Sequence, residues 1–156
     1  MKKALVFLFV IALMQACRKE PDPPALEPTP VVTPKPQFYS KANGQELSCA
    51  TCFSSYYSGG LRGVNFYLGS SGDRIVLNFS AKPSTGTFNL VKFGDPSFTY
   101  QKDNTYYRGV GTFTITKVDT SSNGTIKSLV GTFSCKTDTS NNLSFDFTEG
   151  SINVNN

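Results

Sequence analysis

Two cysteines with redox-type spacing are the residues best placed for chemistry in this 156-residue sequence. Cys49-Ala-Thr-Cys52 has the Cys-x-x-Cys spacing of dithiol oxidoreductases, in which a helix N-terminus lowers the pKa of the reactive thiol. The flanking residues predict strand and loop rather than helix, so we expect structural cysteines. A metal site built from Cys49, Cys52 and Cys135 would need a fourth ligand, and the sequence contains no His. We therefore expect neither redox catalysis nor a bound metal.

The same three cysteines can form at most one intrachain disulfide in an oxidising compartment. If residues 46–52 form a regular strand, Cys49 and Cys52 point to opposite faces about 10 Å apart, too far for a bond. A bridge from either one to Cys135 closes a loop of over 80 residues. By the loop-closure entropy, such a bridge stabilises the fold by about 4 kcal/mol. The favoured prediction is therefore a bridge to Cys135. The alternative is a turn at Ala50 and Thr51 that joins Cys49 to Cys52.

The composition also excludes the commonest catalytic groups. Without His, general bases of the imidazole type and Ser-His-Asp triads are ruled out. Asp95, Asp103 and Asp138 fall at predicted turns, and no two carboxylates stand out as the acid and base of a glycosidase. The net charge is +4, but the cations are spread singly, whereas a nucleic-acid binder concentrates them on one face. We predict no catalytic residue and no nucleic-acid partner.

Two pairs of adjacent tyrosines are the binding candidates. Tyr56 and Tyr57 precede Ser-Gly-Gly in a predicted loop, and Tyr106 and Tyr107 begin a predicted long strand. Exposed tyrosines stack on sugars or line protein interfaces, which suggests a glycan or an envelope protein as partner. The alternative is ordinary packing, because one ring of an adjacent pair usually faces the core of a sheet. Burial of Tyr57 and Tyr107 would remove the binding hypothesis.

The elements that must position these residues are predicted to be strands. Ile75, Leu77 and Phe79 alternate with polar residues, and runs such as Ser122-Asn123-Gly124 supply hairpin turns. The order Gly-Thr-Phe recurs in three segments, which begin at residues 86, 111 and 131. A glycine in or at the start of a strand marks a bulge or a close approach of two backbones. Strands are expected near residues 37–42, 46–52, 62–68, 73–80, 86–92, 97–101, 105–118, 124–136 and 143–154. The predicted fold class is all-β, an antiparallel meander of eight or nine strands forming a sandwich or a flattened barrel.

The N-terminal part has a different character. Lys2 and Lys3 precede an apolar run at residues 4–14, whose length of about 17 Å as a helix is too short for a bilayer core of about 30 Å. This pattern indicates a secretory signal. Residues 18–36 hold seven of the nine prolines and can extend to roughly 60 Å as polyproline helix. We expect a signal peptide at 1–16, a modified Cys17 with a proline-rich tether at 17–36, and one all-β domain at 37–156.

Residues 13–17, Leu-Met-Gln-Ala-Cys, resemble the lipobox of bacterial lipoproteins, although Met14 and Gln15 replace the preferred Leu and small residue. The resemblance implies cleavage before Cys17, followed by attachment of a diacylglycerol and an N-acyl chain to that residue. This lipid is the only group that we expect the protein to carry. Because Arg18 stands where an aspartate retains some lipoproteins at the inner membrane, the resemblance points to the outer membrane, on either its periplasmic or its outer face.

Most of the chain resembles small uncharacterised lipoproteins of Bacteroidota. The shared features are the lipobox and spacer, an opening strand that ends in an Asn-Gly turn (residues 38–44), late Gly-Thr-Phe strands and a terminal Glu-Gly strand at Glu149 and Gly150. That family has no established activity, so the resemblance implies compartment and fold only. We expect a lipid-anchored binding or accessory module without catalytic activity. The alternative is a lipocalin-like carrier of a small apolar ligand, which requires an open apolar cavity.

Overall fold

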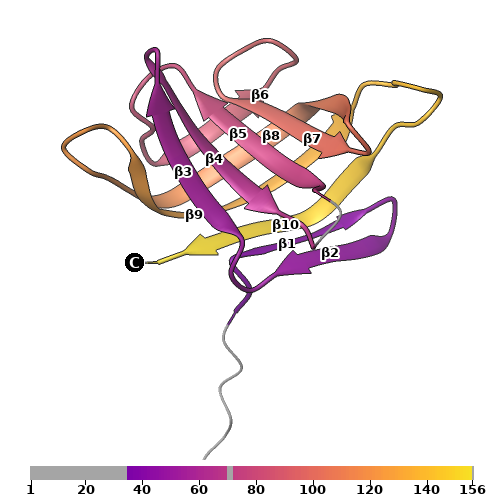
Figure 1. The fold of residues 1–156 in the computed structure, drawn as a ribbon, viewed down its shortest axis with the longest axis horizontal. Helices are drawn as coiled ribbons and strands as arrows, with labels where there is room; N and C mark the ends of the chain where they lie inside the picture. Colours follow the sequence, from indigo (N-terminus) through magenta and orange to yellow (C-terminus); the bar gives the residue numbers. More distant parts are fainter. Residues whose placement is uncertain (1–34, 70–71, 156) are drawn as a thin grey trace, which may run out of the picture. The chain divides into compact units, whose positions relative to one another are not determined.

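A computed structural model describes residues 35–69 and 72–155 of the chain (Figure 1). The predicted signal peptide, the predicted lipidation site Cys17 and most of the predicted tether lie outside the described residues. Within the described part there are strands and turns and no helix. All strand pairs are antiparallel, which confirms the predicted all-β fold class.

The described residues form ten strands, one more than the nine ranges expected from the sequence. They are β1 (Phe38–Ala42), β2 (Gln45–Cys49), β3 (Phe53–Ser58), β4 (Leu61–Tyr67), β5 (Arg74–Phe79), β6 (Gly86–Leu90), β7 (Ser97–Lys102), β8 (Thr105–Thr120), β9 (Ile126–Thr137) and β10 (Asp146–Val154). The additional strand is β3, which was expected to be a loop. Its six residues are a serine- and aromatic-rich run without regular alternation, so its sequence carries a weak strand signal.

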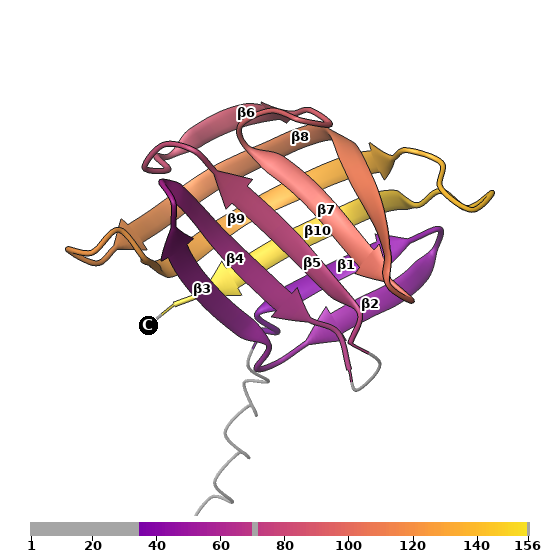
Figure 2. The same cartoon turned by 45° about the horizontal axis from the view of Figure 1, so that its top comes forward.

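The strands form one sheet in the order β2-β1-β10-β9-β8-β7-β5-β4-β3, with β6 paired to β8. This order departs from a simple meander because β1 lies beside β10. The long strand β8 pairs with β7 along its first part and with β6 farther along. The sheet curls so that β3, β4, β5 and β7 form a front layer that crosses a back layer of β8, β9, β10 and β1 (Figures 1 and 2). The result is a half-barrel.

Phenylalanine rings fill the space between the two layers. Phe98 of β7 lies 5.4 Å from Phe133 of β9 and 5.1 Å from Phe147 of β10, measured between ring centroids. Phe38 of β1 and Phe66 of β4 are 5.3 Å apart, so this contact joins strands near the two ends of the sheet order. All of these rings are buried. Their contacts explain why a chain with 13 phenylalanines can form a closely packed core without helices.

Two glycines of the recurring Gly-Thr-Phe order lie where neighbouring backbones approach closely, as predicted. A Cβ at Gly111 would stand 2.1 Å from the carbonyl oxygen of Ser134, and a Cβ at Gly131 would stand 2.3 Å from that of Thr114. Both distances are far below any real contact, so the β8–β9 pairing requires glycine at these two positions.

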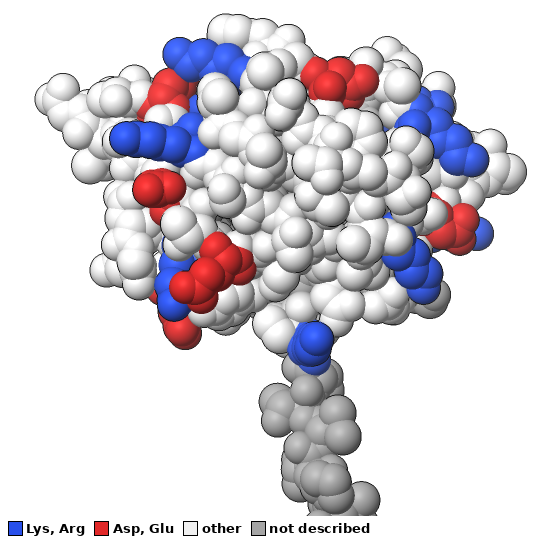
Figure 3. Space-filling model, turned by 180° about the vertical axis from the view of Figure 1, so that it is seen from behind, with Lys and Arg blue, Asp and Glu red and all other residues white. Residues whose placement is uncertain are grey.

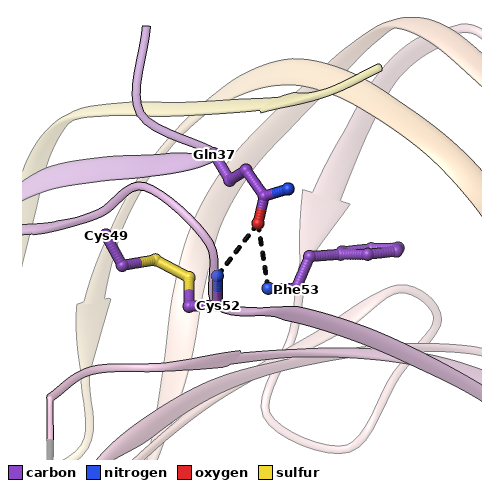
Figure 4. The surroundings of a disulfide bond; sticks show 4 residues. All are labelled: Gln37, Cys49, Cys52 and Phe53. Carbon is purple, nitrogen blue, oxygen red and sulfur yellow. Dashed lines mark hydrogen bonds between the residues drawn. A yellow bond between two sulfur atoms is a disulfide. The ribbon is translucent and has the colours of Figure 1, made fainter. Parts of the chain in front are cut away.

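The disulfide joins Cys49 to Cys52, so the favoured prediction of a bridge to Cys135 is wrong and the alternative pairing is the one observed. Strand β2 ends at Cys49, and the following turn brings the two Cα atoms to 5.8 Å. The Gln37 side-chain oxygen accepts hydrogen bonds from the backbone N–H groups of Cys52 (2.9 Å) and Phe53 (3.1 Å), as Figure 4 shows. Because β2 and β3 are the two ends of the sheet order, this short turn holds the ends together at one corner.

Candidate functional site

Tyr56 on β3 is held in place by its neighbours on β4 and β5. The strand register sets Tyr56 directly opposite Gly63, and the absence of a side chain there lets the phenol ring lie over the glycine. The Tyr56 hydroxyl donates a hydrogen bond to Asn78 Oδ1. Burial raises the pKa of Tyr56, and the nearby Arg74 guanidinium offsets part of that increase. Tyr56 is therefore a neutral, fixed phenol at neutral pH.

The outward side chains of the front layer and of the start of β8 surround a hollow of about 430 Å³, which we call the front hollow. Its lining residues are Tyr56, Asn65, Arg74, Val76, Asn78, Thr99, Tyr106 and Arg108. They come from five strands, because the register sets Val76 opposite Thr99 and Thr99 opposite Arg108. Regular strands hold these groups with little freedom, which reduces the entropy that binding must overcome.

Arg74 is oriented by contacts on two sides. Its Nε–H donates to Gln101 Oε1 at 2.7 Å, and its guanidinium lies 6.0 Å from the centre of the Tyr67 ring. Within residues 35–69 and 72–155, the ion pairs are made by Lys41, Lys92 and Lys102 and none involves an arginine. Neither arginine of the front hollow therefore forms an ion pair with a carboxylate of residues 35–69 and 72–155.

Arg108 lies over the ring of Phe93, with its guanidinium carbon 4.8 Å from the ring centre. Phe93 belongs to the loop between β6 and β7 and is 81% exposed. The loop is fixed on both sides of this ring, because Lys92 forms an ion pair with Asp138 (3.2 Å) and Asp95 accepts a hydrogen bond from the backbone N–H of Ser80 (2.9 Å). An exposed aromatic side chain is thus held beside the front hollow by a well-anchored loop.

The structure brings two of the four predicted tyrosines together. Tyr56 and Tyr106 both line the front hollow, and Tyr106 is 51% exposed. Tyr57 is 46% exposed but lies under the guanidinium of Arg62, outside the front hollow. Tyr107 is 2% exposed and belongs to the core, so its selection as a binding residue is wrong. Alternation along β8 explains this result, since adjacent residues of a strand face opposite sides of the sheet.

Sequence reasoning missed the two arginines, Asn65, Asn78 and Phe93. Arg74 and Asn78 were recognised only as the polar face of a predicted strand. Their role depends on the pairing of β5 with β7, which skips β6 and cannot be inferred from local pattern. The available signal was composition, because arginine beside tyrosine on an outward face is typical of binding surfaces.

The cysteines offer little reactive chemistry. Cys135 faces the core as a free thiol, and burial raises its pKa, so the thiol stays protonated at neutral pH. Cys49 and Cys52 are joined by the disulfide. Among the residues that the structure describes, no group of three or more His, Cys, Asp or Glu side chains could hold a metal ion.

The opposite surface has a different composition. Figure 3 shows its charged residues around the margin and uncharged residues across the centre. One hollow there is lined largely by hydroxyl-bearing residues, for example Thr112, Thr132 and Ser151. A second also includes apolar residues such as Val130 and Ile152. The front hollow differs because its lining includes two arginines, two tyrosines and two asparagines, whereas the hollow beside Lys35 has one lysine, one tyrosine and one asparagine.

No protein-family model matches this sequence, and neither a curated protein nor a solved structure matches the chain. In the described part of the chain there is no helix long and apolar enough to span a membrane. The residues of the front hollow are therefore the main guide to function.

Proposed function

We propose that this protein is a lipid-anchored binding module of a bacterial outer membrane and that its front hollow binds a saccharide. The lipobox-like residues 13–17 and the proline-rich segment that follows support the anchor and the tether. The front hollow supports the binding role, since it gathers outward side chains from five strands onto one rigid surface.

The convergence of an exposed phenol with several fixed polar groups is the observation that carries the saccharide assignment. Tyr106 offers a half-exposed ring on which the apolar face of a sugar can stack. Asn78 and Thr99, which are both half-buried, contribute a carboxamide and a hydroxyl that can exchange hydrogen bonds with sugar hydroxyls. A mostly hydroxylated ligand matches this mixture better than an apolar one.

The packing of the interior favours this surface role over a lipocalin-like carrier. A carrier requires an open apolar cavity inside the barrel. Here the rings of Phe98, Phe133 and Phe147 occupy the space between the layers with centroid separations of 5.1–6.5 Å. A ligand would therefore reach the outer surface more readily than the interior.

Isothermal titration of the full chain with a panel of neutral and acidic oligosaccharides tests the saccharide proposal. Tyr106→Ala should weaken the binding of a positive saccharide by about tenfold, which corresponds to about 1.4 kcal/mol of lost stacking. Tyr57→Ala is the matched control, because Tyr57 is similarly exposed but lies outside the front hollow. Equal affinities for the two variants and the parent chain would disprove a site at the front hollow.

Metabolic labelling with an alkyne fatty acid tests the anchor. The parent chain should incorporate the label and partition with outer membranes, and Cys17→Ser should abolish both properties. Mass spectrometry of the mature N-terminus gives a second readout. An unacylated mature start in the parent chain would contradict the proposed anchor while leaving the saccharide proposal intact.

A further inference from the structure

Two arginines line the front hollow, and neither forms an ion pair within the described part of the chain. Arg74 and Arg108 take part in none of the ion pairs of residues 35–69 and 72–155. The nearby Asp138 carboxylate pairs with Lys92 and accepts a hydrogen bond from the backbone N–H of Arg108 at 2.7 Å, rather than binding the guanidinium. The lining itself includes no acidic residue. An anionic ligand would supply negative charge that can pair with both arginines.

We infer that the ligand of the front hollow is an acidic saccharide whose carboxylate or sulfate groups bind Arg74 and Arg108. This inference rests on the proposed function and adds the chemical class of the sugar. A guanidinium presents a planar fork of donors that matches carboxylate and sulfate oxygens, and such charge-assisted pairs are about twice as strong as neutral hydrogen bonds.

The strand register sets the separation of the Cα atoms of the two arginines. Arg74 lies opposite Gln101 on β7, whereas Arg108 of β8 lies opposite Thr99, one step of two residues along the same strand. Two strand spacings of about 4.8 Å across the sheet and about 6.7 Å along it place the two Cα atoms roughly 12 Å apart. An oligosaccharide with two or more acidic units can reach both side chains, so the two arginines can bind one chain at two points.

Both guanidiniums are partly immobilised before a ligand arrives. The Nε–H of Arg74 is committed to Gln101, which directs the terminal nitrogens of the fork elsewhere. The face of Arg108 covers the Phe93 ring, which leaves the edge of the guanidinium for an anion. Fixing a long side chain in advance reduces the entropy lost on binding, so these arginines suit recognition better than freely moving surface lysines.

Phe93 extends the site beyond the front hollow. Arg108 covers one side of the ring, and the ring remains 81% exposed. The anchored loop holds it beside Arg108, where a sugar unit bound through its acidic group could stack. This arrangement favours a saccharide over an acidic peptide, because a peptide needs the charges but not two aromatic surfaces, Phe93 and Tyr106.

Titration calorimetry of the full chain with four probes tests the inference. The probes are oligogalacturonate, its fully methyl-esterified form, dextran sulfate and poly-glutamate. We expect oligogalacturonate or dextran sulfate to bind, the methyl ester to bind at least tenfold more weakly than the acid, and poly-glutamate to bind weakly. The stronger of the two anionic saccharides identifies the acidic group.

Arginine variants assign the effect to residues. Arg74→Gln and Arg108→Gln should each weaken acidic-saccharide binding about tenfold, and Arg108→Lys should recover part of the loss because it restores charge without the fork. Arg62→Gln, which removes an arginine outside the front hollow, should change affinity by less than twofold. Circular dichroism establishes that each variant is folded.

The outcomes separate this inference from the proposed function. Equal binding of the acid and its methyl ester, with sensitivity to Tyr106→Ala retained, overturns the acidic class and leaves the saccharide site standing. Poly-glutamate binding as tight as that of the acidic saccharides overturns saccharide recognition in favour of an acidic protein segment. Saccharide binding that is insensitive to Tyr106→Ala and to both arginine variants overturns the site itself.

Discussion

Replacing Gly63 with alanine should displace Tyr56 from the front hollow. A Cβ at position 63 would stand 2.1–2.3 Å from the Cζ, Cε1 and hydroxyl oxygen of Tyr56. The clash involves the far end of a side chain, so the ring can rotate away while the β3–β4 pairing remains. Rotation would break the hydrogen bond from the Tyr56 hydroxyl to Asn78 and remove one wall of the front hollow.

The size of the effect follows from three contributions. Losing the hydrogen bond costs about 1 kcal/mol, and exposing part of the ring costs roughly 1 kcal/mol more. Alanine in place of glycine within a strand returns about 0.5–1 kcal/mol. Gly63→Ala should therefore lower the free energy of unfolding by about 1–1.5 kcal/mol, and urea denaturation with an m-value of about 2 kcal/mol/M would show a midpoint lower by about 0.5–0.8 M.

A double-mutant cycle makes this prediction specific to Tyr56. Tyr56→Phe alone should cost about 1 kcal/mol, because it removes the hydrogen bond to Asn78. In the Gly63→Ala background that bond is already broken, so Tyr56→Phe should cost almost nothing further. The expected coupling is about 1 kcal/mol, well above the 0.3–0.5 kcal/mol scatter of independent sites. Additive losses would refute the packing of Tyr56 over Gly63.

Three further predictions concern the core, the disulfide and pH. Phe147→Ala should lower the free energy of unfolding, measured with urea, by about 3–5 kcal/mol, because the ring is fully buried among other aromatics. Phe93→Ala should lower it by less than about 1 kcal/mol. Equal losses in the two variants would contradict the layered core. Cys49→Ser with Cys52→Ser should lower the free energy of unfolding by about 2 kcal/mol, the value for a four-residue loop, and peptide mapping should find the Cys49–Cys52 bridge in the parent chain. Burial raises the pKa of Tyr100 from 10.0 to about 12, so between these pH values the folded state keeps a proton that the unfolded state loses. In thermal melts, the contribution of Tyr100 to stability should be constant below about pH 10 and should decline towards pH 12. An equal decline in Tyr100→Phe would contradict this cause.

The fold class could be predicted because alternation in strands is a local property. Ile75, Leu77 and Phe79 face the core on β5 as their spacing indicated, and the glycines at 111 and 131 lie at close approaches. Strand β3 could not be predicted in the same way, because Phe53–Ser58 lacks regular alternation and is held by its pairing with β4. The disulfide prediction failed because it assumed that β2 continues to Cys52.

The candidate site could be predicted only in part. Tyr56 and Tyr106 were selected for their residue type, and both line the front hollow. Their association with Arg74 and Arg108 depends on the pairing of β5 with β7, which skips β6, and on the pairing of β7 with β8. Such register information comes from packing of the whole sheet and is absent from any single segment of the sequence.

Backbone NMR of the ¹⁵N-labelled full chain during titration with oligogalacturonate shows where on the molecule an acidic saccharide binds. If the front hollow is the ligand site, the largest amide shifts should fall on its strands, at Val76, Thr99 and Arg108. Arg108→Gln should make these shifts several-fold smaller at a ligand concentration near the Kd of the parent chain. Shifts that centre on Thr114 and Thr132 of the opposite surface, or that persist unchanged in Arg108→Gln, would contradict ligand binding at the front hollow.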